Sequence, residues 1–290
     1  MIIDFHNHCF PDKIAAKAVD SLSKSTRTKA FTDGRASSLK SAAASAGVDL
    51  SVILPVATSP DQVVKINDRS RCYDGSDGLL SFACMHPDFS DYKAELSRIK
   101  AMGYRGVKLH HVFQDTDIDD IRSLRIINEC ASLGLIVYVH AGLDMGFPGV
   151  VRCSPAMIKN ALEQVGIPSA KDPYGGYQFI AAHMGGWRNW EEAAQFLPQL
   201  NVYIDTSTSL GRLHPRKDDD LLTEEDLTLL DSAGFMRLYD AFGPEHIVFG
   251  SDSPWNDILE TLDFLRSLPL DEASLKLILG GNAEKLLGLG

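Results

Sequence analysis

The chain alternates short apolar runs with longer segments in which apolar residues recur at helical spacing. The apolar runs are followed by polar residues, glycine or proline, as is typical of strands buried on both faces of a sheet. The segments Tyr92–Met102, Ile118–Leu133 and Trp190–Leu197 between them predict helices. The predicted strands are Ile2–Phe5, Leu50–Val56, Leu79–Cys84, Gly106–Leu109, Leu135–Val139, Phe179–Ala182, Val202–Asp205 and Ile247–Gly250.

Strands that are each followed by a helix predict an α/β protein with a parallel sheet. Eight such strands close most simply into a (β/α)₈ TIM barrel, here a single domain over residues 1–290. An open, doubly wound sheet is the alternative, because periodicity alone does not distinguish the two. After the last strand, Ser253-Pro254 predicts the start of a further helix from about Trp255 to Leu265.

Two connections are longer than a barrel needs, residues 141–178 after the fifth strand and 206–245 after the seventh. The first includes a predicted helix, Pro155–Gln164, with Ser154 as its cap. In a barrel both connections would lie over the C-terminal mouth of the strands, where active sites are assembled. We expect residues 206–245 to form part of a cover over the site.

Composition narrows the classes of partner. The net charge of −11 disfavours nucleic acid and anionic membranes as partners, and leaves a small molecule as the expected one. The five cysteines are scattered without a C-x-x-C pair, which predicts a reduced, cytoplasmic setting. The N-terminal MIIDFHNH predicts no secretory signal, and no apolar run approaches the roughly 18 residues of a membrane helix.

Histidine and aspartate residues stand at the predicted C-terminal ends of several strands. His6 and His8 share one face of the first strand because alternate residues point the same way. His140, His183 and Asp252 end the fifth, sixth and eighth strands, and such ends converge in a barrel. A buried histidine bonded to a backbone carbonyl is the alternative at any one position, but it does not explain their agreement. Imidazole and carboxylate are the usual ligands of Zn²⁺, so a metal site is predicted at the mouth.

Six stretches, in order along the whole chain, carry a family resemblance: Asp4-x-His6-x-His8, Gly106-Val107-Lys108-Leu109-His110, the strand ends at His140 and His183, Gly250-Ser251-Asp252-Ser253-Pro254, and Gly281–Leu289. Together they resemble the amidohydrolase superfamily. The second and the last stretch resemble its amidohydrolase-2 branch. This branch holds metal-dependent hydrolases and the aminocarboxymuconate semialdehyde decarboxylase-like enzymes.

The resemblance implies roles for these residues. His6, His8, His140 and Asp252 would be the metal ligands, with Zn²⁺ as the expected ion and Mn²⁺ or another divalent ion as alternatives. The metal would activate a water and polarise the substrate's carbonyl. Asp252 would take the proton from that water, and His183 would stabilise the oxyanion or move a proton.

Lys108, at the predicted end of the fourth strand, has two interpretations. An ammonium group has no lone pair and cannot ligate a metal. The resemblance implies either a carboxylated lysine that bridges two metals or a plain cation that binds a substrate carboxylate, and we favour the cation. His110 shares the face of Lys108 by alternation and is predicted to line the pocket.

Other residues near strand ends are weaker candidates for substrate contact. His86 follows the third strand and either contacts substrate or shapes the turn. Arg152 and Arg212 lie in the two long connections, where an arginine can hold a carboxylate through two hydrogen bonds, although most loop arginines are only solvated. Trp187 and Trp255 follow the sixth and eighth strand motifs and are candidates for pocket walls, with core packing as the alternative.

The predicted function is hydrolysis of a small, carboxylated amide, ester or lactone. The alternatives are a metal-dependent, non-oxidative decarboxylase, which is a lyase, and a metal-binding protein without turnover. Such a binding protein would not need the acid/base pair of Asp252 and His183. Gly106–His110 resembles the hydrolase members more than the muconate-type decarboxylases, which favours hydrolysis. A homodimer is expected only from the resemblance.

Overall fold

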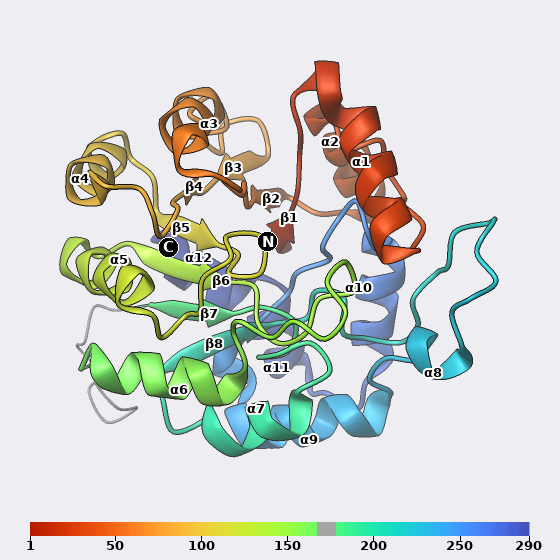
Figure 1. Cartoon of the computed structure of the whole chain (residues 1–290). Helices are drawn as coiled ribbons and strands as arrows, with labels where there is room; N and C mark the ends of the chain where they lie inside the picture. The colour runs from red at the N-terminus through yellow and green to blue at the C-terminus, as the bar shows by residue number, and fades with distance from the viewer. Residues whose placement is uncertain (167–177, 290) are drawn as a thin grey trace. The chain divides into compact units, whose positions relative to one another are not determined.

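The computed structural model describes residues 1–166 and 178–289 (Figure 1). The chain divides into two compact units. Unit 1 comprises Met1–Ile53, Gly78–Leu80 and Asp205–Gly290, and unit 2 comprises Leu54–Asp77 and Ser81–Ile204. No helix among the described residues is both long enough and apolar enough to cross a membrane.

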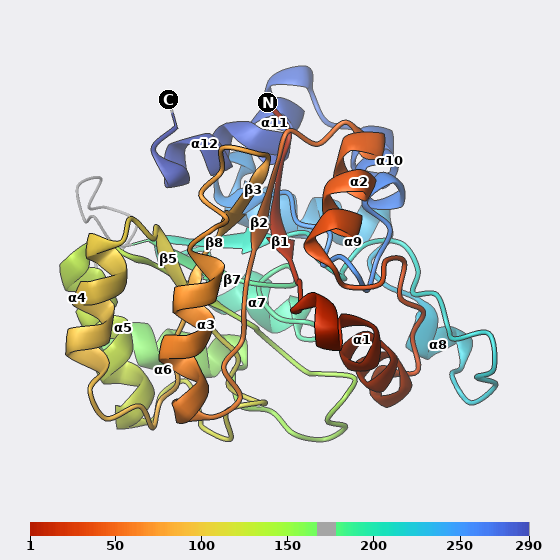
Figure 2. The same ribbon diagram turned by 90° about the horizontal axis from the view of Figure 1, so that it is seen from above.

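Unit 1 is built around strand β1 (Ile3–Asn7), which pairs in parallel with β2 (Leu50–Ile53), followed in the sheet by β3 (Leu79–Ser81). The amide of Phe5 in β1 donates to Phe249 O, just after β9 (Ile247–Val248). In Figure 2, α2 and α10 lie side by side. The helices are α1 (Asp12–Thr26), α2 (Ala36–Ala46), α8 (Glu224–Leu227), α9 (Ser232–Phe242), α10 (Ile258–Ser267), α11 (Glu272–Lys276) and α12 (Asn282–Leu287), with the single turns η2 (Pro244–His246) and η3 (Leu277–Gly281).

Unit 2 contains a parallel run of strands in chain order, each paired with the next. They are β4 (Ala83–Cys84), β5 (Gly106–Leu109), β6 (Ile136–Val139), β7 (Phe179–Ala181) and β8 (Val202–Asp205), whose last residue opens the final segment of unit 1. Figure 1 shows α4, α5 and α6 following one another along one side of these strands. The helices are α3 (Val63–Ser70), α4 (Tyr92–Ala101), α5 (Ile121–Leu133), α6 (Pro155–Gln164) and α7 (Trp190–Phe196), with the turn η1 (Pro60–Gln62).

The strands form where the apolar runs predict them, and their residues are buried almost throughout. Helix α6 has the predicted bounds: the side chain of Ser154 accepts from Met157 N, and Pro155 occupies the first turn. Helix α5 begins at Ile121 rather than Ile118, because the side chain of Asp120 accepts from Arg122 N and caps it there.

Several further element boundaries differ from the predictions. The strand predicted at Leu79–Cys84 is two strands, β3 and β4, separated at Phe82. Strand β1 runs on to Asn7. Residues 206–245 are not one irregular loop, since they contain α8 and α9.

The helix predicted from about Trp255 begins at Ile258 instead. The side chain of Asp257 accepts from Leu259 N and Glu260 N and is therefore its cap. The amide of Trp255 donates to Asp252 O at 2.8 Å, which keeps Ser253-Pro254 in the preceding turn. The Ser-Pro signal thus belongs to the loop that carries Asp252.

Candidate metal centre

Unit 1 brings His6, His8 and Asp252 together at the end of β1. His6 Nε2 and His8 Nε2 lie 3.2 Å apart. Asp252 Oδ1 lies 3.2 Å from His8 Nε2 and 3.6 Å from His6 Nε2. His6 and Asp252 are buried, and His8 is partly buried. The three side chains therefore present one ligand atom each to a single point.

These separations fit a bound divalent ion. Ligand bonds of about 2.0–2.2 Å in a tetrahedral site place neighbouring ligand atoms about 3.3–3.6 Å apart. The observed separations of 3.2, 3.2 and 3.6 Å are close to three edges of such a tetrahedron. Two imidazoles and a carboxylate are also the ligand types that zinc and related divalent ions accept.

The backbone of β1 and of the loop after β9 holds this arrangement. Asp252 N donates to His6 O at 2.8 Å, and His8 N donates to Ser253 O at 2.7 Å. Asp252 has a φ of +66°, in the left-handed region that a residue other than glycine seldom adopts. A Cβ at Gly250 would lie 2.9 Å from His6 Cβ, so only glycine lets the two segments approach this closely.

His6 is oriented by two residues that follow β8. Asp205 Oδ2 lies 2.7 Å from His6 Nδ1, and Ser207 Oγ lies 2.9 Å from the same nitrogen. An ionised carboxylate only accepts, so Nδ1 carries the ring hydrogen and Nε2 keeps its lone pair. A carboxylate behind a histidine ligand is the usual support of a metal site.

Asp4 ties the two segments together from within the core. Its carboxylate accepts from Ser251 N at 2.9 Å, from Ser251 Oγ at 2.6 Å and from His6 N at 3.3 Å. Burial raises the pKa of Asp4 to about 7, against the lowering effect of these hydrogen bonds. Asp4 thus positions the backbone beneath His6 and Asp252.

Unit 2 holds a second cluster, formed by His110, His140, Asp144 and His183. His183 Nε2 lies 2.9 Å from His140 Nδ1, and His140 Nε2 lies 3.0 Å from the carbonyl oxygen of Leu143. Because a carbonyl only accepts, Nε2 of His140 carries the hydrogen. Its Nδ1 then keeps the lone pair, available to a metal or to a proton on His183.

Asp144 lies beside both His110 and His140, but the ring geometry does not suit an ion held among the three. Asp144 Oδ2 is 3.5 Å from His110 Nε2 and 3.7 Å from His140 Nε2. The two imidazoles are stacked, with centroids 4.2 Å apart and planes only 16° apart. Imidazole lone pairs lie in the ring plane, so in stacked rings they point side by side rather than to one point.

The cluster rests on two loops joined by a close backbone contact. Trp187 N donates to Ala141 O at 2.9 Å, and Leu143 N donates to Trp187 O at 3.0 Å. A Cβ at Gly142 would lie 2.2 Å from Trp187 N, and Gly142 has a φ of +86°. Glycine is therefore required where the loop bearing His140 meets the loop bearing His183.

Lys108 and His111 are buried in unit 2 near this cluster. Lys108 is 1% exposed, and its Nζ lies 4.9 Å from the centroid of the Tyr138 ring, a cation–π contact. Burial, followed by the charges of His140 and Lys108, lowers the pKa of His111 to about 3. Neither ring nitrogen of His111 has a hydrogen-bond partner within the described part of the chain.

The weaker candidates for substrate contact, His86, Arg152 and Arg212, already have hydrogen-bond partners within the protein. His86 is buried, and its Nδ1 accepts from Asp88 N at 3.1 Å, which shapes the turn. Arg152 donates to Asp115 and Asp117, and Arg212 donates to Glu224 through both terminal nitrogens. These acidic partners already occupy both guanidinium groups, so the structure adds no support for a role in holding a substrate carboxylate.

The two tryptophan candidates differ in exposure. Trp187 is 9% exposed, and its Nε1 has no hydrogen-bond partner among residues 1–166 and 178–289. Trp255 is half-buried and follows the turn that carries Asp252. A role of either as a pocket wall stays a prediction.

Sequence reasoning missed Asp205, Thr208 and Asp144. Asp205 ends a predicted apolar strand, which is the same signal that singled out Asp252, and could have been found by it. Thr208 Oγ1 contacts Asp252 Oδ2, and Asp144 contacts His110 and His140. Both follow strand ends by a few residues, where no sequence rule indicates the contact.

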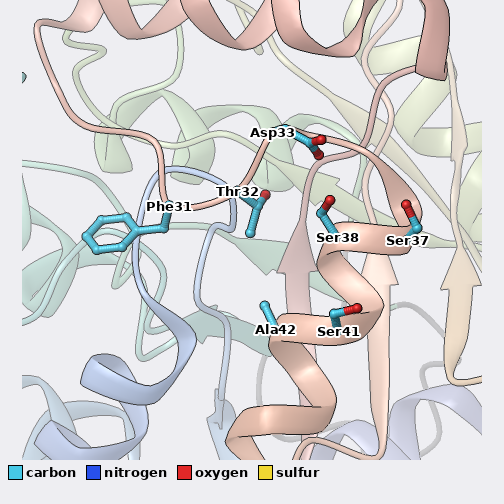
Figure 3. A pocket seen from close by; sticks show the side chains of 7 residues that line it. All are labelled: Phe31, Thr32, Asp33, Ser37, Ser38, Ser41 and Ala42. Atoms are coloured by element: carbon cyan, nitrogen blue, oxygen red, sulfur yellow. The ribbon is translucent and has the colours of Figure 1, made fainter.

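Unit 1 also has an open hollow between residues 31–33 and one face of α2, lined by Phe31, Thr32, Asp33, Ser37, Ser38, Ser41 and Ala42 (Figure 3). Arg35 donates to both oxygens of Asp33, and a hydrogen bond from Ser38 is the main cause that lowers the pKa of this carboxyl. None of the residues of the two histidine clusters lines this hollow.

Solved structures similar to this chain share its fold. An uncharacterised TIM-barrel protein from Bordetella bronchiseptica has a TM-score of 0.72 at 18% identity, covering 99% of this chain and 98% of its own. A dihydroxybenzoic acid decarboxylase from a Polaromonas species, with bound manganese and 2-nitroresorcinol, has a TM-score of 0.64 at 14% identity, with 99% and 97% covered.

A putative 2-pyrone-4,6-dicarboxylic acid hydrolase from Pseudomonas putida has a TM-score of 0.64 at 15% identity, with 99% and 97% covered. At these identities the likeness shows the fold, and the predicted TIM barrel is confirmed. No curated protein matches the chain.

The family model described as amidohydrolase matches residues 3–289, nearly the whole chain. Its match, together with the His and Asp groups, supports a divalent metal. The chain therefore belongs to the amidohydrolase-2 family, as its strand-end motifs predict.

Proposed function

We propose that this protein is a divalent-metal-dependent hydrolase of a small, carboxylated amide, ester or lactone. The observation that carries the proposal is the convergence of His6 Nε2, His8 Nε2 and Asp252 Oδ1 at 3.2–3.6 Å. We propose these three as metal ligands, with Zn²⁺ as the ion because their separations suit tetrahedral ligation. The fourth ligand predicted from the sequence, His140, stays a prediction, and its Nδ1 lone pair is the one suited to that role.

A divalent ion at this centre would acidify a water and polarise a substrate carbonyl. Asp252 would accept the proton of that water and return it to the leaving group. Asp205 would hold His6 in the ligating tautomer through the hydrogen bond to Nδ1. His183, predicted to stabilise the oxyanion, faces His140 Nδ1 at 2.9 Å, so its Nε2 can hold or exchange a proton.

Decarboxylation is the second candidate, favoured by the solved structures of dihydroxybenzoate and carboxyvanillate decarboxylases that share the fold. It would use the same ligands but would need a group that protonates the carbon losing CO₂. Mn²⁺ is the corresponding alternative ion, since the Polaromonas enzyme was solved with manganese.

The two reactions differ in what happens to water. Metal-loaded protein is incubated in ¹⁸O-labelled water with carboxylated amides, esters and lactones, and separately with aromatic and muconate-type acids. The proposal predicts ¹⁸O in the product and no CO₂. Release of CO₂ without ¹⁸O incorporation, from the only substrates turned over efficiently, would identify the enzyme as a decarboxylase.

Replacement of Asp252 tests its part as the base. We expect Asp252→Asn to remove most turnover while some metal stays bound, because the amide can still offer an oxygen to the ion but cannot take a proton. Turnover and metal content are measured on the same preparation. Undiminished turnover in Asp252→Asn would exclude Asp252 as the base.

A further inference from the structure

Asp252 is held on the side away from the histidines by a chain of hydrogen bonds within unit 1. Thr208 Oγ1 lies 2.5 Å from Asp252 Oδ2, and Asn256 Nδ2 lies 2.8 Å from Thr208 Oγ1. The same nitrogen of Asn256 lies 3.1 Å from Ser251 O. The chain of contacts therefore runs from Asn256 through Thr208 to Asp252.

The direction of each hydrogen bond follows from the chemistry of its partners. A backbone carbonyl only accepts, so the Asn256 atom facing Ser251 O is the amide nitrogen. This nitrogen has a second hydrogen, which it donates to Thr208 Oγ1. The hydroxyl of Thr208 thus accepts from Asn256 and keeps its own single hydrogen for Asp252 Oδ2.

This arrangement decides which oxygen of Asp252 faces the histidines. Oδ2 accepts from Thr208, while Oδ1 lies 3.2 Å from His8 Nε2 and 3.6 Å from His6 Nε2. The hydrogen bond from Thr208 therefore fixes the orientation of the Asp252 carboxylate and leaves Oδ1 turned towards His6 and His8.

The backbone conformation of Thr208 is a second, independent indication that its side chain has a functional role. Its φ is +43°, a conformation in which a β-branched residue is an outlier. Glycine or asparagine would occupy it with less strain, and outliers of this kind cluster at functional sites. The hydrogen bond to Asp252 gives a reason for a hydroxyl-bearing residue at this position.

We propose that Thr208 and Asn256 are positioning residues that orient Asp252 for ligation of a divalent metal. The inference rests on the proposed function, in which Asp252 is a metal ligand. Thr208 acts directly on Asp252, and Asn256 acts through Thr208 by fixing the direction of its hydroxyl.

The test is the affinity of the metal-free protein for Zn²⁺, measured by competition with a chromogenic chelator. Thr208→Val removes the hydroxyl but keeps the β-branched shape, so the backbone strain is unchanged. We expect it to bind Zn²⁺ about 10- to 100-fold more weakly, the usual loss when a residue supporting a ligand is removed. Thr208→Ser keeps the hydroxyl and should bind as the wild type does.

Asn256→Leu leaves the hydroxyl of Thr208 in place but no longer directs it, so we expect a smaller loss of affinity. The double variant should bind no more weakly than Thr208→Val alone, because both residues act along one chain. Thr261→Val is the matched control: its hydroxyl donates to the carbonyl of Asp257, the cap of α10, at 2.9 Å and contacts neither Thr208 nor Asp252, so we expect wild-type affinity. Losses that add in the double variant would overturn the proposed chain.

The outcomes separate the inference from the function on which it rests. A wild-type protein that binds no divalent ion would contradict the proposed function. A wild type that binds Zn²⁺ tightly, with Thr208→Val equal to it, would overturn the positioning role and leave the proposed function standing. Thermal unfolding of each metal-free variant shows that it is folded; if Thr208→Val does not fold, the comparison of Asn256→Leu with Thr261→Val decides, and equal affinities overturn the inference.

Discussion

At the scale of single residues, the site is determined by which atoms carry hydrogens. The carboxylate of Asp205 fixes the hydrogen of His6 on Nδ1, and the carbonyl of Leu143 fixes that of His140 on Nε2. Each leaves the opposite ring nitrogen with a lone pair. The groups behind the two histidines therefore leave each of them with a lone pair, as the ligand roles proposed for them require.

His111 shows the opposite case, a buried histidine that must stay neutral. Its pKa is lowered to about 3 in the folded protein, mainly by burial, whereas in the unfolded chain it is about 6.5. Below about pH 6.5 the unfolded state binds the additional proton, so this contribution to stability is complete above that pH and is lost as the pH falls towards 3. At pH 5 the loss amounts to about 2 kcal/mol.

We therefore expect His111→Leu, which has no titrating group, to lose less stability than the wild type when acidified. The free energy of unfolding is measured with denaturant at pH 8 and pH 5 for both proteins. The difference between the two pH values should be smaller in the variant by about 2 kcal/mol. Equal differences in the two proteins would show that His111 does not titrate as the structure indicates.

The candidate ligands could be predicted from the sequence because they occupy strand ends, and a strand end is visible as the end of an apolar run. Asp205 carries the same signal, but its partner His6 lies 199 residues away, so its role is visible only in three dimensions. Thr208 and Asn256 carry no signal, because a hydroxyl or amide in a loop is usually solvated. Their role depends on distances of 2.5 and 2.8 Å that no spacing rule encodes.

At the scale of elements, the apolar runs predict where the strands lie. Where a helix begins is decided by the residue that caps its first turn. Ser154-Pro155 marks the start of α6 in the sequence, and the observed bounds, Pro155–Gln164, equal the predicted ones. The same dipeptide at Ser253-Pro254 predicts a helix start at about Trp255, and this prediction is wrong. Asp257 is the cap of α10, and Trp255 N donates to Asp252 O in the preceding turn. Helix α9 was hidden in a region predicted as a loop, although Asp231 caps it through Gly234 N.

The junction of the loops after β6 and β7 gives a prediction at this scale. We expect Gly142→Ala to destabilise the protein strongly, because its φ of +86° disfavours a side chain and a Cβ would lie 2.2 Å from Trp187 N. Gly149→Ala is the matched control, since Gly149 has a φ of +80° but nothing lies within 4 Å of its added Cβ.

The control should lose about 1–2 kcal/mol of unfolding free energy from the left-handed backbone alone. Gly142→Ala should lose a further 1–3 kcal/mol or so from the steric overlap. Denaturant unfolding measures both. Equal losses in the two variants would mean that the loops bearing His140 and His183 are not held together by this contact.

At the scale of the whole molecule, the family match over residues 3–289 and the TIM-barrel likeness agree with the fold predicted from alternating strands and helices. The sequence predicts the fold, but it does not predict the substrate or the reaction as closely. Solved structures that share the fold include both a decarboxylase and a putative hydrolase, so the fold does not identify the reaction. Substrate-binding residues of enzymes are often on loops, where the pattern of apolar and polar residues is least informative. The cover expected from residues 206–245 stays a prediction.

The metal content of the purified protein tests the central claim most directly. Elemental analysis compares the wild type with the His6→Ala, His8→Ala double variant. The control is the His214→Ala, His246→Ala double variant, in which the lost imidazoles face Glu260 and Phe242 O instead. We predict about one divalent ion per chain in the wild type and the control, and little in the His6/His8 variant. Full metal occupancy in the His6/His8 variant would contradict the proposed centre.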